Sequence, residues 1–374
     1  MKTSFKLLFS LCLCINLSGL VNAQSLEDKF QHVLDSVYKA NPESVGIMFH
    51  VEAPNHGVSW NSAIGFSNKK TQEKINKNQP ALIASNTKTY VAVAILKLIE
   101  NGKISLNEPI KKVISKSSRR ELKNDGYNLN EITIKHLLSH TSGISDYVND
   151  AYFEFVNKHP KYQWNRNEQI KLAMKVGNPL YKAGEDYKYA DVNYLLLTEI
   201  LERKTKTPYY VAIKNLIDFK KHKLNNTWFI DLENSPQHTL PLVHQYWNKY
   251  NWDSYQLNPS WDLFGGGGLV ATTKDLALFF QLLFEGKIIT NKSVLKLMHT
   301  KVLSDEKSVY CLGLKSISFF GEAAYYHGGF WGTDVMYLPK LNASISAFTL
   351  QKDKRLLNAK ISNIFVQLLK NATH

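Results

Sequence analysis

Cysteine is scarce in this chain of 374 residues, which contains three. Cys12 and Cys14 lie within the first 23 residues, so Cys311 stands alone in the remainder. A lone cysteine excludes an internal disulfide, and the fold must therefore rest on its hydrophobic core. A hydrophobic content of 44% is ample for such a core. The stretch around Cys311 is typical of a strand, in which we expect a buried and inert thiol.

After residue 23 the chain also lacks any apolar run of the ~20 residues that a membrane-spanning helix requires. The first 23 residues contain two lysines, an apolar run from Leu7 to Leu17 and a terminal Ala23. This pattern predicts a signal peptide at residues 1–23 that is cleaved before Gln24. A membrane anchor is the alternative, but the run is short for one. We therefore expect an exported protein, periplasmic or secreted, with no stable membrane span after cleavage.

Acidic residues are outnumbered, with 32 Asp and Glu against 46 Lys and Arg. The net charge is +14, and the basic residues are scattered and form no stripe. Such a charge favours general attraction to anionic surfaces such as a cell envelope. Nucleic-acid binding is not expected, because no binding motif accompanies the charge. The glycine run at Phe264–Leu269 lacks the Lys-Ser/Thr of a phosphate loop, so no nucleotide cofactor is expected either.

Strand-like patterns occupy both ends of the chain, and helical patterns fill its middle. Two strands flank a turn at Pro54–Gly57, four more follow residue 309, and an amphipathic helix closes the chain. We predict an α/β fold in which an antiparallel sheet, flanked by helices, is built from residues 24–105 and 300–374. Residues 106–299 would form an inserted, mostly helical lobe. The cleft between the lobes is the expected place for a site.

Ser85 and Lys88 lie three residues apart at the start of a predicted helix that ends at Asn101–Gly102. At that spacing both side chains share one helix face. A serine hydroxyl becomes a nucleophile when a neighbouring base takes its proton, and a deprotonated lysine is such a base. The alternative is structural, because serine is a common N-cap and lysine is common in helices.

Other candidate residues occur farther along the chain. Tyr189 and Asp191 come just before an apolar helix, and a phenol beside a lysine can carry a proton. His327–Gly329 lies on a predicted strand, where small residues let a substrate approach the backbone. His136 and His140 have the spacing of zinc ligands, but the Glu of the metalloprotease motif and a third ligand are missing, so we expect no metal.

In these segments the chain resembles the serine β-lactamase and penicillin-binding-protein superfamily. The resemblance is greatest to the branch of class C β-lactamases, DD-peptidases and related esterases, and it covers almost all of the chain after residue 23. Five segments carry it in family order: Ser85-x-x-Lys88, His136–Tyr147, Tyr189-Ala190-Asp191, Gly265–Phe279 and His327-Gly328-Gly329.

The resemblance implies roles for these residues. Ser85 would attack a carbonyl and form an acyl-enzyme, while Lys88 and Tyr189 would share the proton transfers. The oxyanion would be held by the backbone N–H groups of Ser85 and Phe330. His327, Gly328 and Gly329 would line the substrate-binding edge.

Three positions depart from the common family pattern. Asp191 replaces the usual Asn, and an ionised Asp would stabilise the Lys88 ammonium, which favours Tyr189 as the base. Gly328 replaces a hydroxyl residue that helps many relatives to hold the carboxylate of β-lactams. Phe330 makes the same edge apolar. β-Lactams are therefore predicted to be poor substrates.

The predicted function is an exported serine hydrolase that acts on an amide, a peptide of D-amino acids or an ester. Its substrate would be a small molecule or peptide, with cell-wall material as one source. The alternatives are a β-lactamase and a non-catalytic binder of envelope peptides.

An aromatic stretch from residue 246 to residue 261 leaves two interpretations open. It either walls the cleft or packs on its own domain. Its rings are those of Tyr246, Trp247, Tyr250, Trp252, Tyr255 and Trp261.

Overall fold

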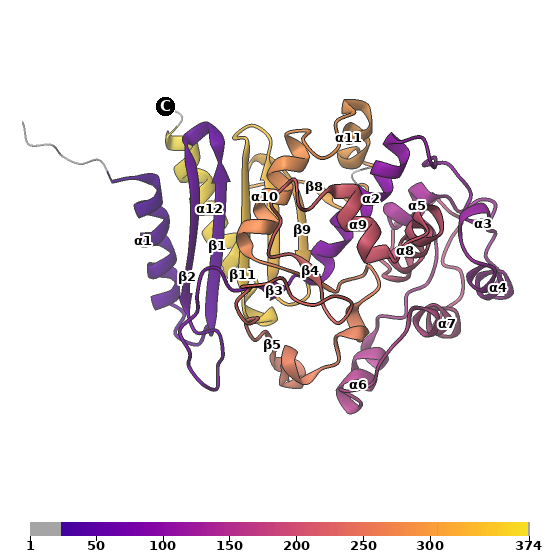
Figure 1. Ribbon diagram of the computed structural model, residues 1–374, viewed down its shortest axis with the longest axis horizontal. Coiled ribbons are helices and arrows are strands. Elements are labelled where there is room, and N and C mark those ends of the chain that lie inside the picture. The colour runs from indigo at the N-terminus through magenta and orange to yellow at the C-terminus, as the bar shows by residue number, and fades with distance from the viewer. Residues whose placement is uncertain (1–23, 305, 373–374) are drawn as a thin grey trace, which may run out of the picture.

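A computed structural model describes residues 24–304 and 306–372 (Figure 1). The predicted signal peptide and its two cysteines lie outside the described residues. No helix within the described ranges is both long enough and apolar enough to cross a membrane.

A six-stranded antiparallel sheet organises the fold, with the strand order β2-β1-β11-β10-β9-β8. The first strand of the β1–β2 hairpin therefore pairs inside the sheet with the last strand in the sequence, β11, and Ile47 lies opposite Thr349. This arrangement confirms the predicted α/β fold with a sheet made from both ends of the chain. The strands are β1 (Gly46–Ala53), β2 (Val58–Gly65), β8 (Lys315–Phe319), β9 (Glu322–Gly329), β10 (Thr333–Leu338) and β11 (Ala343–Thr349).

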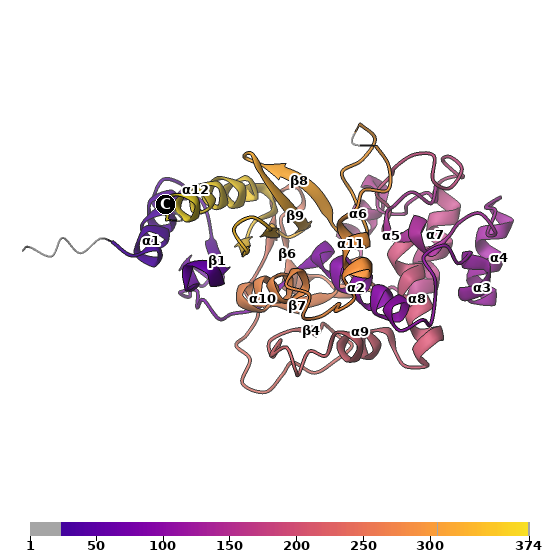
Figure 2. The same ribbon diagram turned by 90° about the horizontal axis from the view of Figure 1, so that it is seen from above.

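Helices cover both faces of this sheet (Figure 2). On one face α1 (Leu26–Lys39) packs against α12 (Leu356–Ala372), and on the opposite face α10 (Thr273–Phe284) packs on β1, β10 and β11. Along β1, Met48 belongs to one apolar core while its neighbours Ile47 and Phe49 belong to the other. Because successive strand residues point to opposite faces, this central strand is apolar on both sides.

The middle of the chain contains helices joined by loops, and it also contains short strands. The boundaries of the two predicted lobes stay a prediction. The helix α10 lies within residues 106–299, which were assigned to the helical lobe, but it packs on the sheet. The helices are α3 (Ile110–Val113), α4 (Lys116–Asn124), α5 (Ile134–Leu138), α6 (Asp150–Lys158), α7 (Arg166–Val176), α8 (Val192–Thr205), α9 (Tyr209–Ile217) and α11 (Lys292–His299). The short strands are β3 (Ala81–Leu82), β4 (Trp228–Phe229), β5 (Tyr246–Trp247), β6 (Trp252–Asp253) and β7 (Leu269–Ala271).

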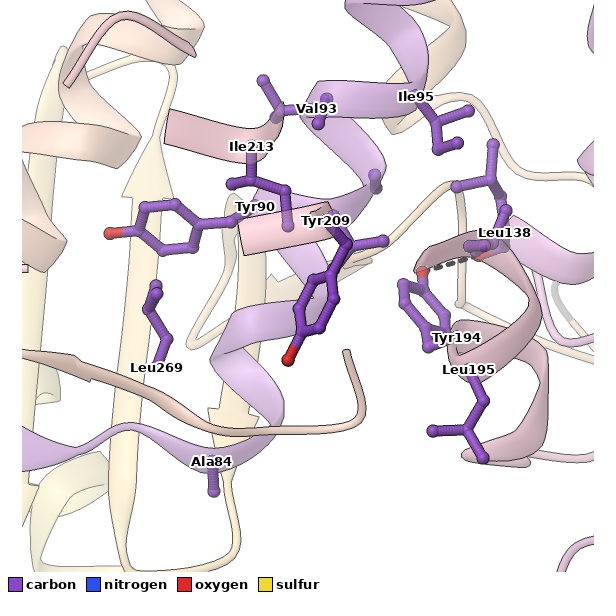
Figure 3. Packing of buried hydrophobic residues seen from close by; sticks show 14 of the residues in the cluster. Ala84, Tyr90, Val93, Ile95, Leu138, Tyr194, Leu195, Tyr209, Ile213 and Leu269 are labelled. Atoms are coloured by element: carbon purple, nitrogen blue, oxygen red, sulfur yellow. Dashed lines mark hydrogen bonds between the residues drawn. The ribbon is translucent and has the colours of Figure 1, made fainter. Parts of the chain in front are cut away.

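The helix α2 (Thr87–Glu100) runs through the interior and is buried along most of its length. It packs against α8 and α9, whose Tyr194 and Tyr209 belong to the same buried cluster (Figure 3). The ring of Tyr90 stacks on Phe279 with centroids 3.7 Å apart. Each fully buried apolar side chain of this kind contributes about 1.5–3 kcal/mol to folding. The helix is therefore a rigid support for whatever lies at its N-terminus.

Cys311 is buried, as predicted, but its position in a strand was wrong. It lies in the turn that precedes β8, whose first residue is Lys315. Gly313 adopts a φ of +82° in this turn, and a Cβ there would lie 2.3 Å from the Cβ of Ala92 on α2. The close approach to α2 ends the extended pattern that the sequence suggested.

Candidate active site

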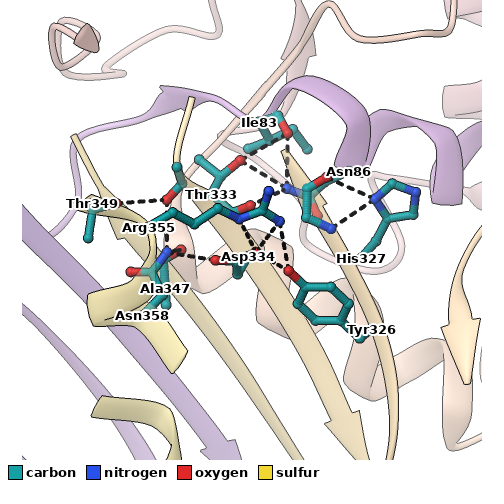
Figure 4. A network of polar contacts seen from close by, with 12 residues as sticks. Ile83, Asn86, Tyr326, His327, Thr333, Asp334, Ala347, Thr349, Arg355 and Asn358 are labelled. Carbon is teal, nitrogen blue, oxygen red and sulfur yellow. Dashed lines mark hydrogen bonds and ion pairs between the residues drawn. The ribbon is translucent and has the colours of Figure 1, made fainter. Parts of the chain in front are cut away.

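Ser85 does not cap the long helix but lies in a separate 3₁₀ turn, η2 (Ala84–Asn86), just before α2. The preceding residue, Ala84, has a φ of +45°, which is uncommon for a residue with a side chain and costs about 1–3 kcal/mol. The amide of Asn86 donates to the Ile83 carbonyl at 2.9 Å, and the hydroxyl of Thr333 donates to the same oxygen at 3.1 Å (Figure 4). These contacts hold Ser85 at the edge of the cleft.

Lys88 is fully buried one turn of α2 away from Ser85. Its Nζ donates to Ser85 Oγ at 2.9 Å and to the Gly266 carbonyl at 2.6 Å, and it forms an ion pair with Asp191 at 2.8 Å. Burial by itself lowers the pKa of Lys88. The neighbouring Asp191, with a further contribution from Tyr189, raises this pKa by a larger amount, so the pKa of Lys88 lies above its usual value. The resting side chain is thus an ammonium whose three N–H bonds point at three acceptors.

Tyr189 lies beside this lysine, with Lys88 Nζ 5.0 Å from the centre of its ring. Burial raises the pKa of Tyr189 to about 12; Lys88 opposes this rise, and Asp191 adds to it. Hydrogen bonds with Lys88 and Ser85 also lower this pKa. The structure therefore brings together the first two predicted motifs, with both the lysine and the phenol protonated at rest.

Two further carboxyl groups, Asp146 and Asp262, line the same cleft as Asp191. Burial, reinforced by the charge of Asp191, raises the pKa of Asp146 to about 7 and that of Asp262 to about 8. Their negative charge is therefore suppressed below neutral pH, because both groups are buried and lie near the carboxyl group of Asp191, which is paired with Lys88. The contact between Asp191 and Lys88 agrees with the sequence analysis, which expected Asp191 to stabilise the Lys88 ammonium because Asp191 stands where the family usually has Asn.

The third predicted motif lies at the end of β9. His327 is buried, and its Nε2 lies 3.0 Å from the hydroxyl of Tyr310. Burial, with Lys88 adding to the effect, holds the pKa of His327 well below its usual range, so the ring is neutral.

Gly329 explains why this strand approaches the serine turn so closely. A Cβ at this position would lie 2.3 Å from the Ile83 carbonyl oxygen and 2.2 Å from Thr333 Oγ1. A glycine is therefore required for β9 to lie against η2. The oxyanion roles of the Ser85 and Phe330 N–H groups stay predictions, although both residues line the cleft.

The cleft has a volume of about 770 Å³, and the predicted residues Ser85, Tyr189, Asp191, Gly328 and Phe330 contribute to its walls. Phe330 stacks on Phe153 at 5.7 Å between centroids and contacts Trp247 and Trp261 edge-on at 5.0 and 5.2 Å. Both interpretations of the aromatic stretch hold in part. Trp247, Trp252 and Trp261 pack as a buried cluster, and Trp261 also faces the cleft, whereas half of the Tyr255 surface is exposed.

The histidine pair has structural roles. His136 lies on α5 and caps its N-terminus together with Thr133. His140 lies beyond the helix with a φ of +56°, and its Nδ1 accepts from the backbone N–H of Ala190 at 3.2 Å. The spacing of the two residues suggested that both lie on one helix, but only His136 does. Within the described ranges, no group of three or more His, Cys, Asp or Glu could hold a metal.

Several site residues were not identified from the sequence as part of the site. Asp146 lies inside the family-like segment His136–Tyr147, and Gly266 lies inside the glycine run, so a signal existed for both. Asp262 belongs to the aromatic stretch, where its neighbours concealed it. Arg355, which also lines the cleft, comes from the C-terminal region and had no signal.

Comparisons with known proteins agree with this geometry. A family model described as Beta-lactamase matches residues 45–367. Protein flp of Staphylococcus aureus strain N315 is 31% identical over 185 residues, which cover 49% of this chain and 35% of that protein. This chain thus spans about a third of the length of that relative.

Solved structures share the fold. D-amino acid amidase from Ochrobactrum anthropi SV3 superposes with a TM-score of 0.76 and 19% identity over 93% of this chain and 99% of that chain. D-stereospecific amidohydrolase from Streptomyces sp. gives a TM-score of 0.72 and 23% identity, with coverages of 86% and 94%.

Proposed function

Since this chain belongs to the β-lactamase family, whose members are serine hydrolases, we propose that it is an exported hydrolase that forms an acyl-enzyme on Ser85. The observation that carries the proposal is the contact of 2.9 Å between Lys88 Nζ and Ser85 Oγ at the wall of the cleft. In the structural alternative, where the serine caps a helix, its side chain would accept from the helix backbone. Ser85 instead precedes α2 in its own turn.

The chemistry requires that a proton leave Ser85 as its Oγ attacks a carbonyl carbon. Lys88 and Tyr189 are both protonated at rest, so one of them must lose its own proton before it can accept that of the serine. The oxyanion is assigned to the backbone N–H groups of Ser85 and Phe330. The departing amine or alcohol then takes the proton back, and water releases the acyl group.

The substrate class that we propose is an amide or short peptide of D-amino acids, with esters as a second class. Similarity of fold to D-amino acid amidase and D-stereospecific amidohydrolase favours the first class. β-Lactam hydrolysis is less favoured, because Gly328 provides no hydroxyl at the edge of the cleft. A non-catalytic binder is the second candidate, favoured by the ion pair that keeps Lys88 protonated.

A fluorescent alkyl phosphonate ester, which phosphonylates activated serines, tests the proposal. Wild-type protein should be labelled, and Ser85→Ala should not, whereas Ser59→Ala on the exposed surface of β2 should label normally. Labelling that persists in Ser85→Ala would overturn the assignment of the nucleophile. Labelling without turnover of any D-amino-acid amide, D-dipeptide, ester or penicillin would favour the binder.

A further inference from the structure

A second groove lies on α4, at the opposite end of the molecule from α1 in both views (Figure 1 and Figure 2). Its volume is about 500 Å³, and it shares no described residue with the active-site cleft. Among the residues that the structure describes, five basic side chains and no acidic one line it: Lys111, Lys116, Arg119, Arg120 and Lys123.

Four of these side chains form a stripe along α4. Lys116, Arg119, Arg120 and Lys123 have the spacing i, i+3, i+4 and i+7 of one helix face, over a length of about 10 Å. Like charges four residues apart destabilise a helix. Lys116 is also the first residue of α4, where the helix dipole disfavours a cation. The sequence analysis described the basic residues as scattered, and on α4 this was wrong, because only the helix brings these charges to one side.

The chain itself supplies little negative charge to offset the stripe. Arg120 lies 3.3 Å from Glu121, but 68% of the arginine side chain is exposed, so this pair contributes little. Lys111, Lys116 and Lys123 form no ion pair within the described ranges. A surface that costs helix stability and stays positively charged is typical of a site for an anionic ligand.

Arg119 holds this groove in shape. Its Nε donates to the Ser115 carbonyl at 3.3 Å, and its Nη1 donates to the Lys111 carbonyl at 3.2 Å, which links α4 to α3. The backbone N–H of Lys111 donates to the Leu129 carbonyl at 3.2 Å and fixes the other wall. Nη2 of Arg119 has no hydrogen-bond partner among the described residues, so its N–H groups are available to a ligand. The groove is therefore preformed, and a ligand need not order it.

We propose that this groove binds a polymer that carries phosphate groups and no bases. Guanidinium and ammonium groups are the usual partners of phosphate oxygens, and their charge-assisted hydrogen bonds are strong. Neighbouring cations of the stripe lie about 5–6 Å apart at their Cβ atoms, which suits several linked phosphates better than one. The site is separate from Ser85, so the inference does not depend on the proposed function. An exported protein would be held by it on an anionic polymer of the envelope.

The floor of the groove disfavours two other anionic partners. Its apolar residues, Tyr127 and Leu129, are 6% and 7% exposed, so neither can enter a lipid bilayer. Single-stranded nucleic acids stack their bases on exposed aromatic rings. Tyr127 is not available for stacking, because it is buried and its hydroxyl accepts from the Ser145 N–H at 3.0 Å.

The experiment follows the fluorescence anisotropy of a labelled short inorganic polyphosphate as the purified protein is added. Wild-type protein should bind it, with an affinity that falls as salt rises, because binding releases counterions. Lys116→Gln/Lys123→Gln should bind roughly 10- to 100-fold more weakly, since two charge-assisted contacts are lost. Lys29→Gln/Lys39→Gln is the matched control, because it removes the same charge from exposed lysines of α1 and should bind as the wild type does.

Two further measurements separate binding from folding and from catalysis. Lys116→Gln/Lys123→Gln removes like-charge pairs from α4, so its midpoint of urea unfolding should equal or exceed that of the wild type. Phosphonate labelling of Ser85 should be unchanged in this variant. A lower midpoint would assign the lysines to the fold and overturn the inference. Binding as tight as that of the wild type, or equal weakening in the α1 control, would overturn it while the proposed function stands.

Competition identifies the class of ligand. Polyglutamate should displace the probe roughly tenfold less well than unlabelled polyphosphate, because a phosphate presents more acceptor oxygens than a carboxylate. A single-stranded oligonucleotide should also compete less well, and vesicles that contain phosphatidylglycerol should bind the wild type and Lys116→Gln/Lys123→Gln alike. Equal displacement by polyglutamate would overturn the assignment of phosphate. Equal displacement by the oligonucleotide, or vesicle binding that is lost in the variant, would overturn the proposed polymer in favour of nucleic acid or a membrane.

Discussion

Asp191 offers the sharpest test of the site, because its carboxylate stabilises the protonated forms of both possible bases. It lies 2.8 Å from Lys88 Nζ and raises the pKa of Lys88 and of Tyr189. The base must be deprotonated to act, so the rate should rise with pH until that group is free. Asp191→Asn removes the charge and keeps an oxygen that can accept from Lys88. The acidic limb of the pH–rate profile should therefore move to lower pH, whichever group is the base.

The size of the shift follows from the geometry. Two unit charges 2.8 Å apart interact by roughly 6 kcal/mol at an effective dielectric constant of about 20, which corresponds to about four pKa units. Relaxation and water around the new amide reduce this value, and we expect about one to two units. At pH 7 that shift is a gain of roughly 10- to 100-fold in kcat/KM, since each pKa unit is a factor of ten.

The assay is the pH dependence of kcat/KM for an activated ester, normalised to active sites counted with the phosphonate probe. Counting active sites corrects for any variant protein that fails to fold. Asp253→Asn is the control, because Asp253 pairs with His244 outside the cleft. An acidic limb that stays in place, or moves to higher pH in Asp191→Asn, would refute the assignment of charge to this site.

Two further substitutions test the geometry and the charges around the site. Gly329→Ala should slow labelling of Ser85 by roughly 100-fold, because its Cβ would push η2 away from β9, whereas Gly57→Ala, with no atom within 4 Å of its Cβ, should label normally. Asp262→Asn should stabilise the fold by about 1–3 kcal/mol more at pH 8 than at pH 4. The folded-state pKa of Asp262 is raised to about 8, so the wild type loses stability as pH rises through that window. Urea unfolding at both pH values measures this, and an equal effect at the two would contradict the raised pKa.

The strands and most helices could be predicted because their signals are local. The apolar run of β1, the alternation along β2, the turn at Pro54–Gly57 and the periodicity of α12 are all properties of neighbouring residues. The helix start near Ser85 was placed less well. The positive φ of Ala84 depends on Asn86 and on Thr333, a residue 249 positions away from Ala84. No local pattern carries that information.

The site could be predicted only where a motif marks its residues. Ser85, Lys88, Tyr189 and His327 belong to segments with family spacing, and the structure places them together. Arg355 lies outside every such segment. Its position depends on Gly328, where a Cβ would lie 1.4 Å from Arg355 Nη2, and on a hydrogen bond of 2.5 Å to Asp334 Oδ1, which is a relation between β9, β10 and the start of α12. The sequence revealed the missing hydroxyl at 328 but not the guanidinium that lies beside this glycine.

The strand order also governs how this molecule can assemble. β1 and β2 form a hairpin within the first fifth of the chain, yet the other edge of β1 pairs with β11, which ends at Thr349. A growing chain therefore presents an open, apolar strand edge until almost all of it has been made. Exposed edges of this kind recruit other chains, and pairing over such a long separation is slow. We expect folding yield to depend on protein concentration and on chaperones that shield β1, independently of how well the finished site works.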